Sequence, residues 1–232
     1  MATDDAPRRV SDVVHERLRG DILDGRLAAG DPVPSERVLA EELGVNRHAV
    51  REALKRLQQA GLVRISQGGA TRVLDWRESG GVELLLDLIR GGGAAPPREV
   101  IGAVLELRAL IGVDATRRFV ARADRASRER LADQVERTLA AIEDPDAPDG
   151  VVVSEYEQLW RLLVAGAENV AYRLLLNSLI VAVDAYPDLA VALVPRDAPR
   201  MRELAAAVRH ADGETAAGLV AAQLEGDARA IG

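Results

Sequence analysis

The hydrophobic residues of the first 60 positions recur at intervals of three and four, which is the spacing of one face of an α-helix. This spacing predicts a first helix that starts near Val10 and ends near Gly25. A second helix is expected from Ser35 to Gly44, and a third from Asn46 to Gly61. Serine and asparagine accept hydrogen bonds from the first backbone N–H groups of a helix, and glycine commonly ends one.

The pattern then changes to alternation. Apolar or β-branched residues alternate with others in "LVRISQGGATRVL", on both sides of Gly68-Gly69. Alternation around a pair of glycines predicts a two-stranded hairpin. Three helices followed by a hairpin within residues 10–74 form a winged helix-turn-helix.

Helical spacing returns in "VELLLDLIR" and continues, without a persuasive strand, to the end of the chain. The fold class is therefore predicted as mainly α, with the winged helix-turn-helix followed by an all-α bundle of six to seven helices. The expected parts are a DNA-binding domain (1–78), a linker with a short helix (79–96), and a domain for effector binding and dimerisation (97–232). The expected helices of the bundle are 97–121, 126–143, 151–167, 170–186, 197–210 and 213–229.

Composition narrows the class of protein. Hydrophobic residues make up 48% of 232, which is enough for a substantial core. The chain has no cysteine, which excludes disulfides and thiolate metal sites. It has no P-loop, dinucleotide fingerprint or nucleophile–histidine array, so we do not expect an enzyme. No apolar run of membrane length is present, and a cytoplasmic protein without membrane contact is expected.

Charge is distributed unevenly. The formal net charge is −7, yet residues 1–78 hold 13 basic and 13 acidic residues, so the whole excess of acid follows residue 78. An acidic protein repels nucleic acid as a whole. Any DNA contact must therefore come from a local arrangement of cations.

Such an arrangement occurs on the third predicted helix. Arg47, Arg51 and Lys55 follow one another at intervals of four, with His48 beside them, and share one face opposite the apolar residues. In a helix-turn-helix, the second helix enters the major groove and contacts bases and phosphates near its N-terminus. An ordinary solvated face has the same pattern, and a winged helix that binds proteins instead of DNA stays an alternative. Only the DNA reader is expected to lose affinity steeply with salt.

The segment "GDPVPSERVLAEELGVNRHAVREALKRLQQAGLVRISQGGATRV" resembles the winged-helix domain of the GntR family of bacterial transcription regulators. The resemblance implies a homodimer that binds an inverted repeat of double-stranded DNA, more commonly as a repressor released by a ligand. Ala49 also matches a contact position, where it can offer only apolar contact with a thymine methyl. The resemblance implies DNA contacts by Arg37, Asn46, Arg47, His48, Arg51, Gln67 and Gly68.

The later segment "VLELRALIGVDATRRFVARA" resembles the FadR-type subgroup, which has an all-helical FCD domain. Many FCD domains hold a divalent metal with one Asp and three His. The corresponding positions here are Glu157, Arg161, Met201 and Gln223. Histidine imidazole is a preferred ligand of first-row cations, and an arginine is a fixed positive charge. We therefore expect no metal and no other cofactor.

A metal-free domain of this subgroup implies a small organic effector, such as a fatty acid, an acyl-CoA or another carboxylate. Arg161 has two interpretations: it contacts an anionic effector, or it forms an ordinary salt bridge with Glu157 four residues earlier. The expected effector-binding residues are Arg108, Tyr156, Glu157, Arg161, Tyr172, Asn177 and Gln223.

Overall fold

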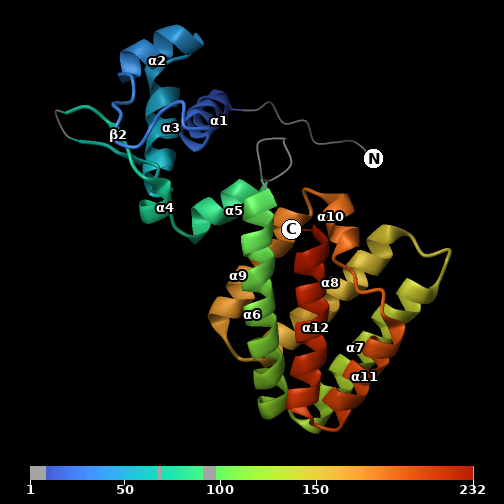
Figure 1. The fold of residues 1–232 in the computed structure, drawn as a ribbon. Helices are drawn as coiled ribbons and strands as arrows, with labels where there is room; N and C mark the ends of the chain where they lie inside the picture. The colour runs from blue at the N-terminus through green and yellow to red at the C-terminus, as the bar shows by residue number, and fades with distance from the viewer. Residues whose placement is uncertain (1–8, 67–68, 91–97, 232) are drawn as a thin grey trace. The chain divides into compact units, whose positions relative to one another are not determined.

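The computed structural model describes residues 9–66, 69–90 and 98–231. It divides into two compact units, Met1–Asp87 and Leu88–Gly232, each described here by itself (Figure 1). The division falls inside the range that the sequence assigns to a linker and short helix. Gln67 and Gly68 lie outside the described residues.

The first unit contains the helix-turn-helix and its hairpin. Ser35 begins the second helix by accepting a hydrogen bond from the Val38 backbone N–H at 3.3 Å. Gly44 ends that helix with a φ of 65°, a backbone conformation that glycine adopts without strain. The helices and strands of this unit are α1 (Val10–Leu23), α2 (Glu36–Leu43), α3 (Arg47–Gln59), β1 (Val63–Arg64), β2 (Arg72–Val73) and α4 (Trp76–Ser79).

The hairpin is antiparallel, with Val63 opposite Val73. Each strand has only two residues, which is shorter than the alternation predicted, and Ile65 is 37% exposed. The segment before α2 is bonded to the chain that enters β2, because the Val33 backbone N–H donates to the Thr71 carbonyl at 2.8 Å. Buried residues from α1, α3 and the strands close the core of this unit: Val14, Leu18, Ile22, Val50, Leu54, Leu57, Val63 and Val73.

The second unit is a helical bundle, as the sequence predicts. A helix that begins in the first unit, α5 (Val82–Arg90), ends in this one. The long helices α6 (Arg98–Arg122) and α12 (Gly213–Ile231) lie side by side (Figure 1). α7 packs against α8 and α11, and α8 also packs against α6 and α9. The remaining helices are α7 (Arg125–Glu143), α8 (Asp149–Gly166), α9 (Val170–Val183), α10 (Pro187–Ala192) and α11 (Ala198–Arg209).

The predicted helix 170–186 was too long. α9 ends at Val183, and a further short helix, α10, begins at Pro187. Proline has no backbone N–H and clashes with the preceding turn, so it interrupts a helix but fits the first position of a new one. The described part of the bundle therefore has seven helices from α6 to α12.

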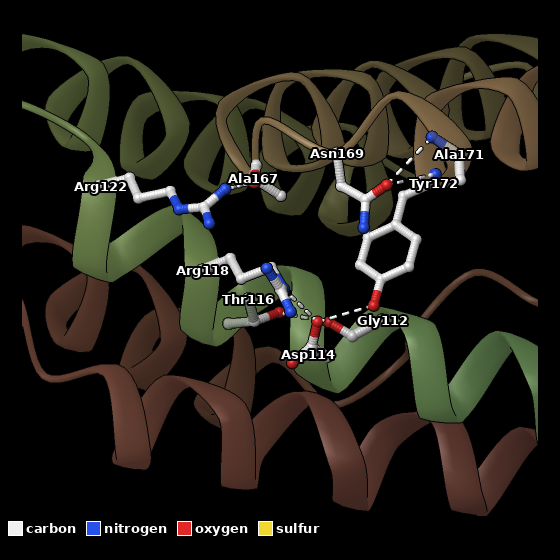
Figure 2. Close-up of polar contacts among 9 residues, drawn as sticks. All are labelled: Gly112, Asp114, Thr116, Arg118, Arg122, Ala167, Asn169, Ala171 and Tyr172. Carbon is white, nitrogen blue, oxygen red and sulfur yellow. Dashed lines mark hydrogen bonds and ion pairs between the residues drawn. The ribbon is translucent and has the colours of Figure 1, made fainter.

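Polar contacts fasten the start of α9 to α6 (Figure 2). The Asn169 side chain accepts from the Ala171 backbone N–H at 3.0 Å and so begins α9. The Tyr172 hydroxyl donates to the Asp114 carboxylate on α6 at 2.7 Å, and the Arg118 guanidinium also donates to Asp114. The first turn of α9 is thereby fixed, and the rest of the helix covers the cavity described below.

Within the described residues, no helix is both long and apolar enough to cross a membrane.

Candidate nucleic-acid interface and effector cavity

α3 separates its apolar and basic residues as the sequence predicts. Val50 and Leu57 are fully buried against the core, at 0% exposure. Arg47, Arg51 and Lys55 are exposed on the opposite side, and so is His48. Asn46 caps the helix, because its side-chain oxygen accepts from the Ala49 backbone N–H at 2.9 Å. We call the exposed side chains of Arg47, His48, Arg51 and Lys55 the basic edge of α3.

One expected contact is corrected. The Ala49 side chain is only 6% exposed and packs into the core, so it does not present a methyl group on the basic edge. Side chains at positions i and i+1 of a helix point in different directions, so Ala49 turns towards the core while the neighbouring His48 is exposed.

Carboxylates compensate much of the basic edge. Arg51 donates two hydrogen bonds to Glu36 on α2, from Nε at 3.0 Å and from Nη2 at 2.7 Å. Lys55 pairs with Glu52 at 3.0 Å. The bonds from Arg51 hold the pKa of Glu36 below its usual range, so this carboxylate is ionised at neutral pH.

Arg37 and Arg47 differ in this respect. Arg37, on α2, pairs with Glu41 one turn later at 2.9 Å. Among the described residues, Arg47 has no carboxylate within ion-pair distance. Arg47 also lies at the first position of α3, where backbone N–H groups point outward without helical partners. A phosphate placed there meets a free guanidinium and a helix N-terminus together.

The second unit contains a partly open cavity of about 120 Å³ between α6, α8, α9 and α10, which Ile89 at the end of α5 also lines. Its wall is mostly aliphatic. Among the residues that line it are Val104, Leu105, Val164, Leu176, Leu179 and Ile180. Four of the predicted effector-binding residues, Arg108, Tyr156, Glu157 and Tyr172, also line this cavity.

A buried polar network lies in the cavity wall. Arg108 donates from Nη1 to the Asp227 carboxylate at 2.6 Å and from Nη2 to the Tyr156 hydroxyl at 2.9 Å. Gln223 donates to the other oxygen of Asp227 at 2.9 Å. The side chains of Arg108 and Asp227 are 16% and 7% exposed. Burial raises the pKa of the Asp227 carboxyl, and Arg108 and Gln223 offset part of that shift.

Asp227 was not among the residues predicted from the sequence. The two acids near Arg108 in the sequence are Glu106 and Asp114, whereas its partner lies 119 residues away on α12. The available signal was the pair Gln223 and Asp227, one turn apart on a helix that is otherwise rich in alanine and leucine.

Arg161 and Asn177 do not line the cavity. Arg161 is 45% exposed and lies 3.8 Å from Glu157, which is the salt bridge of the second interpretation. Its Nη1 donates weakly to the Asn177 side chain at 3.5 Å. Burial raises the pKa of Glu157, whose side chain faces the cavity.

Gln223 belongs to a second, smaller cavity of about 30 Å³, which Met201 also lines. Tyr156 and Trp160 line both cavities. Their rings meet edge to face, with centroids 6.2 Å apart. These two aromatic side chains form the partition between the two spaces.

The four positions implied as metal ligands do not fit a metal ion. Arginine has no lone pair to donate, and the thioether of Met201 is a poor ligand for a hard or borderline cation. The Gln223 amide N–H donates to Asp227, and its amide oxygen is at most a neutral ligand that lines the other cavity. Only Glu157 offers a charged donor, and the described residues contain no group of three or more His, Cys, Asp or Glu placed to hold a metal.

Comparison with known proteins supplies the family of each unit. Residues 10–73 match the family described as bacterial regulatory proteins, gntR family, and residues 103–226 match the FCD domain. The chain is 36% identical over 176 residues to the HTH-type transcriptional regulator Mce2R of Mycobacterium tuberculosis, which covers 74% of this chain and 69% of that protein. It is 32% identical over 165 residues to the Glc operon transcriptional activator of Escherichia coli, and this alignment covers 71% of this chain and 63% of that protein.

A solved structure has a similar fold. It belongs to Lar, which controls the expression of the Listeria monocytogenes agr system, and it aligns over 97% of both chains with a TM-score of 0.51 and 15% identity. At this identity the likeness concerns the fold alone.

Proposed function

The chain belongs to the GntR family of bacterial regulators with an FCD domain, and from this premise we propose that it is a homodimeric repressor whose operator affinity is controlled by a small organic effector. It is a DNA-binding transcriptional regulator and not an enzyme. Beyond the family, we propose that the protein is a homodimer, that it represses transcription, and that the residues named below contact DNA and effector.

The basic edge of α3 carries the DNA-binding part of the proposal. Its side chains are exposed on a helix whose other face is fully buried, so they can enter a groove without disturbing the core. Arg47 contributes most, since among the described residues it forms no ion pair that DNA must break, although the charge of Glu36 is near enough to interact with it. Arg51, Lys55 and Arg37 contribute after DNA displaces their carboxylate partners. The wing residues Gln67 and Gly68 stay predictions.

A duplex selected by the protein from a randomised library provides the probe. We expect Arg47→Ala to abolish specific binding in a fluorescence anisotropy titration, with unchanged helical content by circular dichroism. Arg130→Ala removes the same charge from an exposed position of α7 and is the matched control. Equal binding by the Arg47 variant and the wild type would defeat the assignment. Affinity that does not fall with salt would favour the protein-interaction alternative.

An apolar stripe on α9 supports the homodimer. Val170, Leu174 and Val181 recur at intervals of four and seven on one helix, and they are 72%, 61% and 56% exposed. Leu110 on the neighbouring α6 is 71% exposed. A twofold dimer buries the same patch of both subunits, and an inverted repeat requires two winged helices. A second copy of this chain is the partner that both requirements share.

The cavity of the second unit is the proposed effector site. It is lined by aliphatic side chains with few polar groups, as is typical of small-molecule sites. The effector acts by binding one dimer geometry more tightly than another, a coupling of about 1–3 kcal/mol in typical regulators. Repression released by the effector predicts that ligand lowers operator affinity, whereas an increase would make the protein an activator. A reporter gene behind the selected operator, with and without the regulator, tests the sign.

A further inference from the structure

Two arginines lie opposite each other on the exposed face of the hairpin. Arg64 of β1 is the register partner of Arg72 of β2, so their side chains leave the same face. The valines beside them, Val63 and Val73, are buried on the other face. Side chains paired in this way have Cβ atoms about 5 Å apart, and like charges so placed repel each other. The pair weakens the hairpin unless an anion lies against it.

No carboxylate of the described residues neutralises this pair. Arg72 donates to the Gly30 carbonyl at 2.8 Å, and Arg64 has no hydrogen bond or ion pair within the described part of the chain. Residues 62–74 contain these two arginines and no acid. In contrast, carboxylates pair with other arginines of the same unit, namely Arg17, Arg26, Arg37, Arg51 and Arg56. The hairpin is therefore a cationic segment without internal compensation.

The hairpin lies where a bound duplex presents its backbone. β1 follows α3 after the turn at Gly61 and packs beside it (Figure 1). A helix with its side chains is about 10–12 Å across, and the major groove of DNA is about 12 Å wide. A helix such as α3 therefore fills the groove, and the structure that flanks the helix lies over the phosphates at the border of the groove.

From these observations we propose that Arg64 and Arg72 form a phosphate-binding pair, which holds the DNA backbone beside the groove that α3 enters. A guanidinium has several N–H donors in one plane and binds phosphate oxygens two at a time. A phosphate beside the pair attracts both cations and so offsets their mutual repulsion, while the bond to Gly30 holds the Arg72 side chain in place. This inference rests on the DNA-binding function, and it extends the proposed interface beyond the basic edge of α3.

Arg64→Gln tests the pair, since it removes one charge and leaves Arg72 with its bond to Gly30. Fluorescence anisotropy of the full chain is measured with the selected duplex and with a duplex of the same bases in scrambled order. Phosphate contacts carry no sequence information, so we expect the variant to bind both duplexes roughly 10-fold more weakly at low salt. The slope of log K against log salt should become shallower by about one for each subunit bound.

Two further variants isolate the role of position 64. Arg64→Lys keeps the charge and should retain the salt slope and most of the affinity. Arg17→Gln removes the same charge from an exposed position of α1, where Asp21 pairs with Arg17 at 3.1 Å, and should change neither quantity by much. Without DNA, Arg64→Gln should unfold no earlier than the wild type in a thermal melt, because it removes a repulsion between like charges.

Unchanged binding of both duplexes by Arg64→Gln would overturn the inference. Equal losses from Arg64→Gln and Arg17→Gln would do so too, because only net charge would then matter. A loss confined to the selected duplex would make Arg64 a reader of bases, and a lower unfolding midpoint would make it a structural residue; either result refutes a phosphate-binding pair. The Arg47 variant is measured on the same duplexes. If it loses specific binding while Arg64→Gln binds normally, the inference falls and the proposed role of α3 stands, and the opposite result reverses the two conclusions.

Discussion

Replacing Asp227 with asparagine should destabilise the helical unit strongly. The Arg108–Asp227 pair joins α6 to α12, and its two side chains are 16% and 7% exposed. Asp227→Asn keeps the shape but leaves the Arg108 charge buried without a counter-ion. Removing one partner of a buried pair costs about 3–5 kcal/mol, and the partial exposure of Arg108 places the expected loss near the lower figure. For a chain of this size, about 3 kcal/mol corresponds to a fall in Tm of roughly 6–12 °C.

The same two helices provide a matched control. Arg117 on α6 and Glu214 on α12 also form an ion pair, at 3.2 Å, but their side chains are 50% and 81% exposed. Water screens such a pair, so Glu214→Gln should change the unfolding midpoint little. Thermal and urea unfolding, followed by circular dichroism, compare the two variants. Equal midpoints for Asp227→Asn and Glu214→Gln would refute the reasoning that burial makes the Arg108–Asp227 pair different.

A double variant separates loss of the pair from burial of a lone charge. Arg108→Met combined with Asp227→Leu replaces the pair with apolar side chains of similar volume. We expect this variant to recover most of the stability lost by Asp227→Asn. If both variants are equally unstable, packing or the bonds to Tyr156 and Gln223, not the unpaired cation, account for the loss.

Three further outcomes are expected. Glu36→Gln should remove the carboxylate that DNA must displace from Arg51, so that DNA affinity rises at low salt; weaker binding would mean that Glu36 positions Arg51 for DNA. Leu174→Glu should dissociate the dimer in analytical ultracentrifugation, whereas Val151→Glu, at a 48% exposed position of α8, should not. Hydrogen bonds from Arg118 and Tyr172 lower the pKa of Asp114. Its carboxylate therefore stabilises the fold above the ordinary aspartate pKa, and this stabilisation is lost as pH falls through the lowered pKa. Asp114→Asn should lower the free energy of unfolding in urea at neutral pH, and should make that free energy fall less steeply as the solution is acidified.

Local features of the sequence predicted the first unit well. Ser35 and Asn46 start their helices through bonds to residues three positions later, and such short-range chemistry is readable from the chain. The exposure of Arg47 follows from helical periodicity in the same way. Gln67 and Gly68 stay predictions, since they lie outside the described residues.

The cavity was predicted less completely, because its polar wall is built from distant segments. Arg108 and Tyr156 were identified as polar residues on apolar helices, but their partner Asp227 depends on how α6 meets α12. The carboxylates beside α3 were more accessible: Glu52 lies three residues from Lys55, a spacing that brings helical side chains together.

The partition between the two cavities has a consequence for how this bundle acquires new specificity. Tyr156 and Trp160 are the two residues that line both spaces, of about 120 and 30 Å³. A smaller side chain at either position would enlarge the room that a ligand can occupy. The reach of the cavity thus depends on side chains that can be exchanged one at a time, while the helical scaffold is kept.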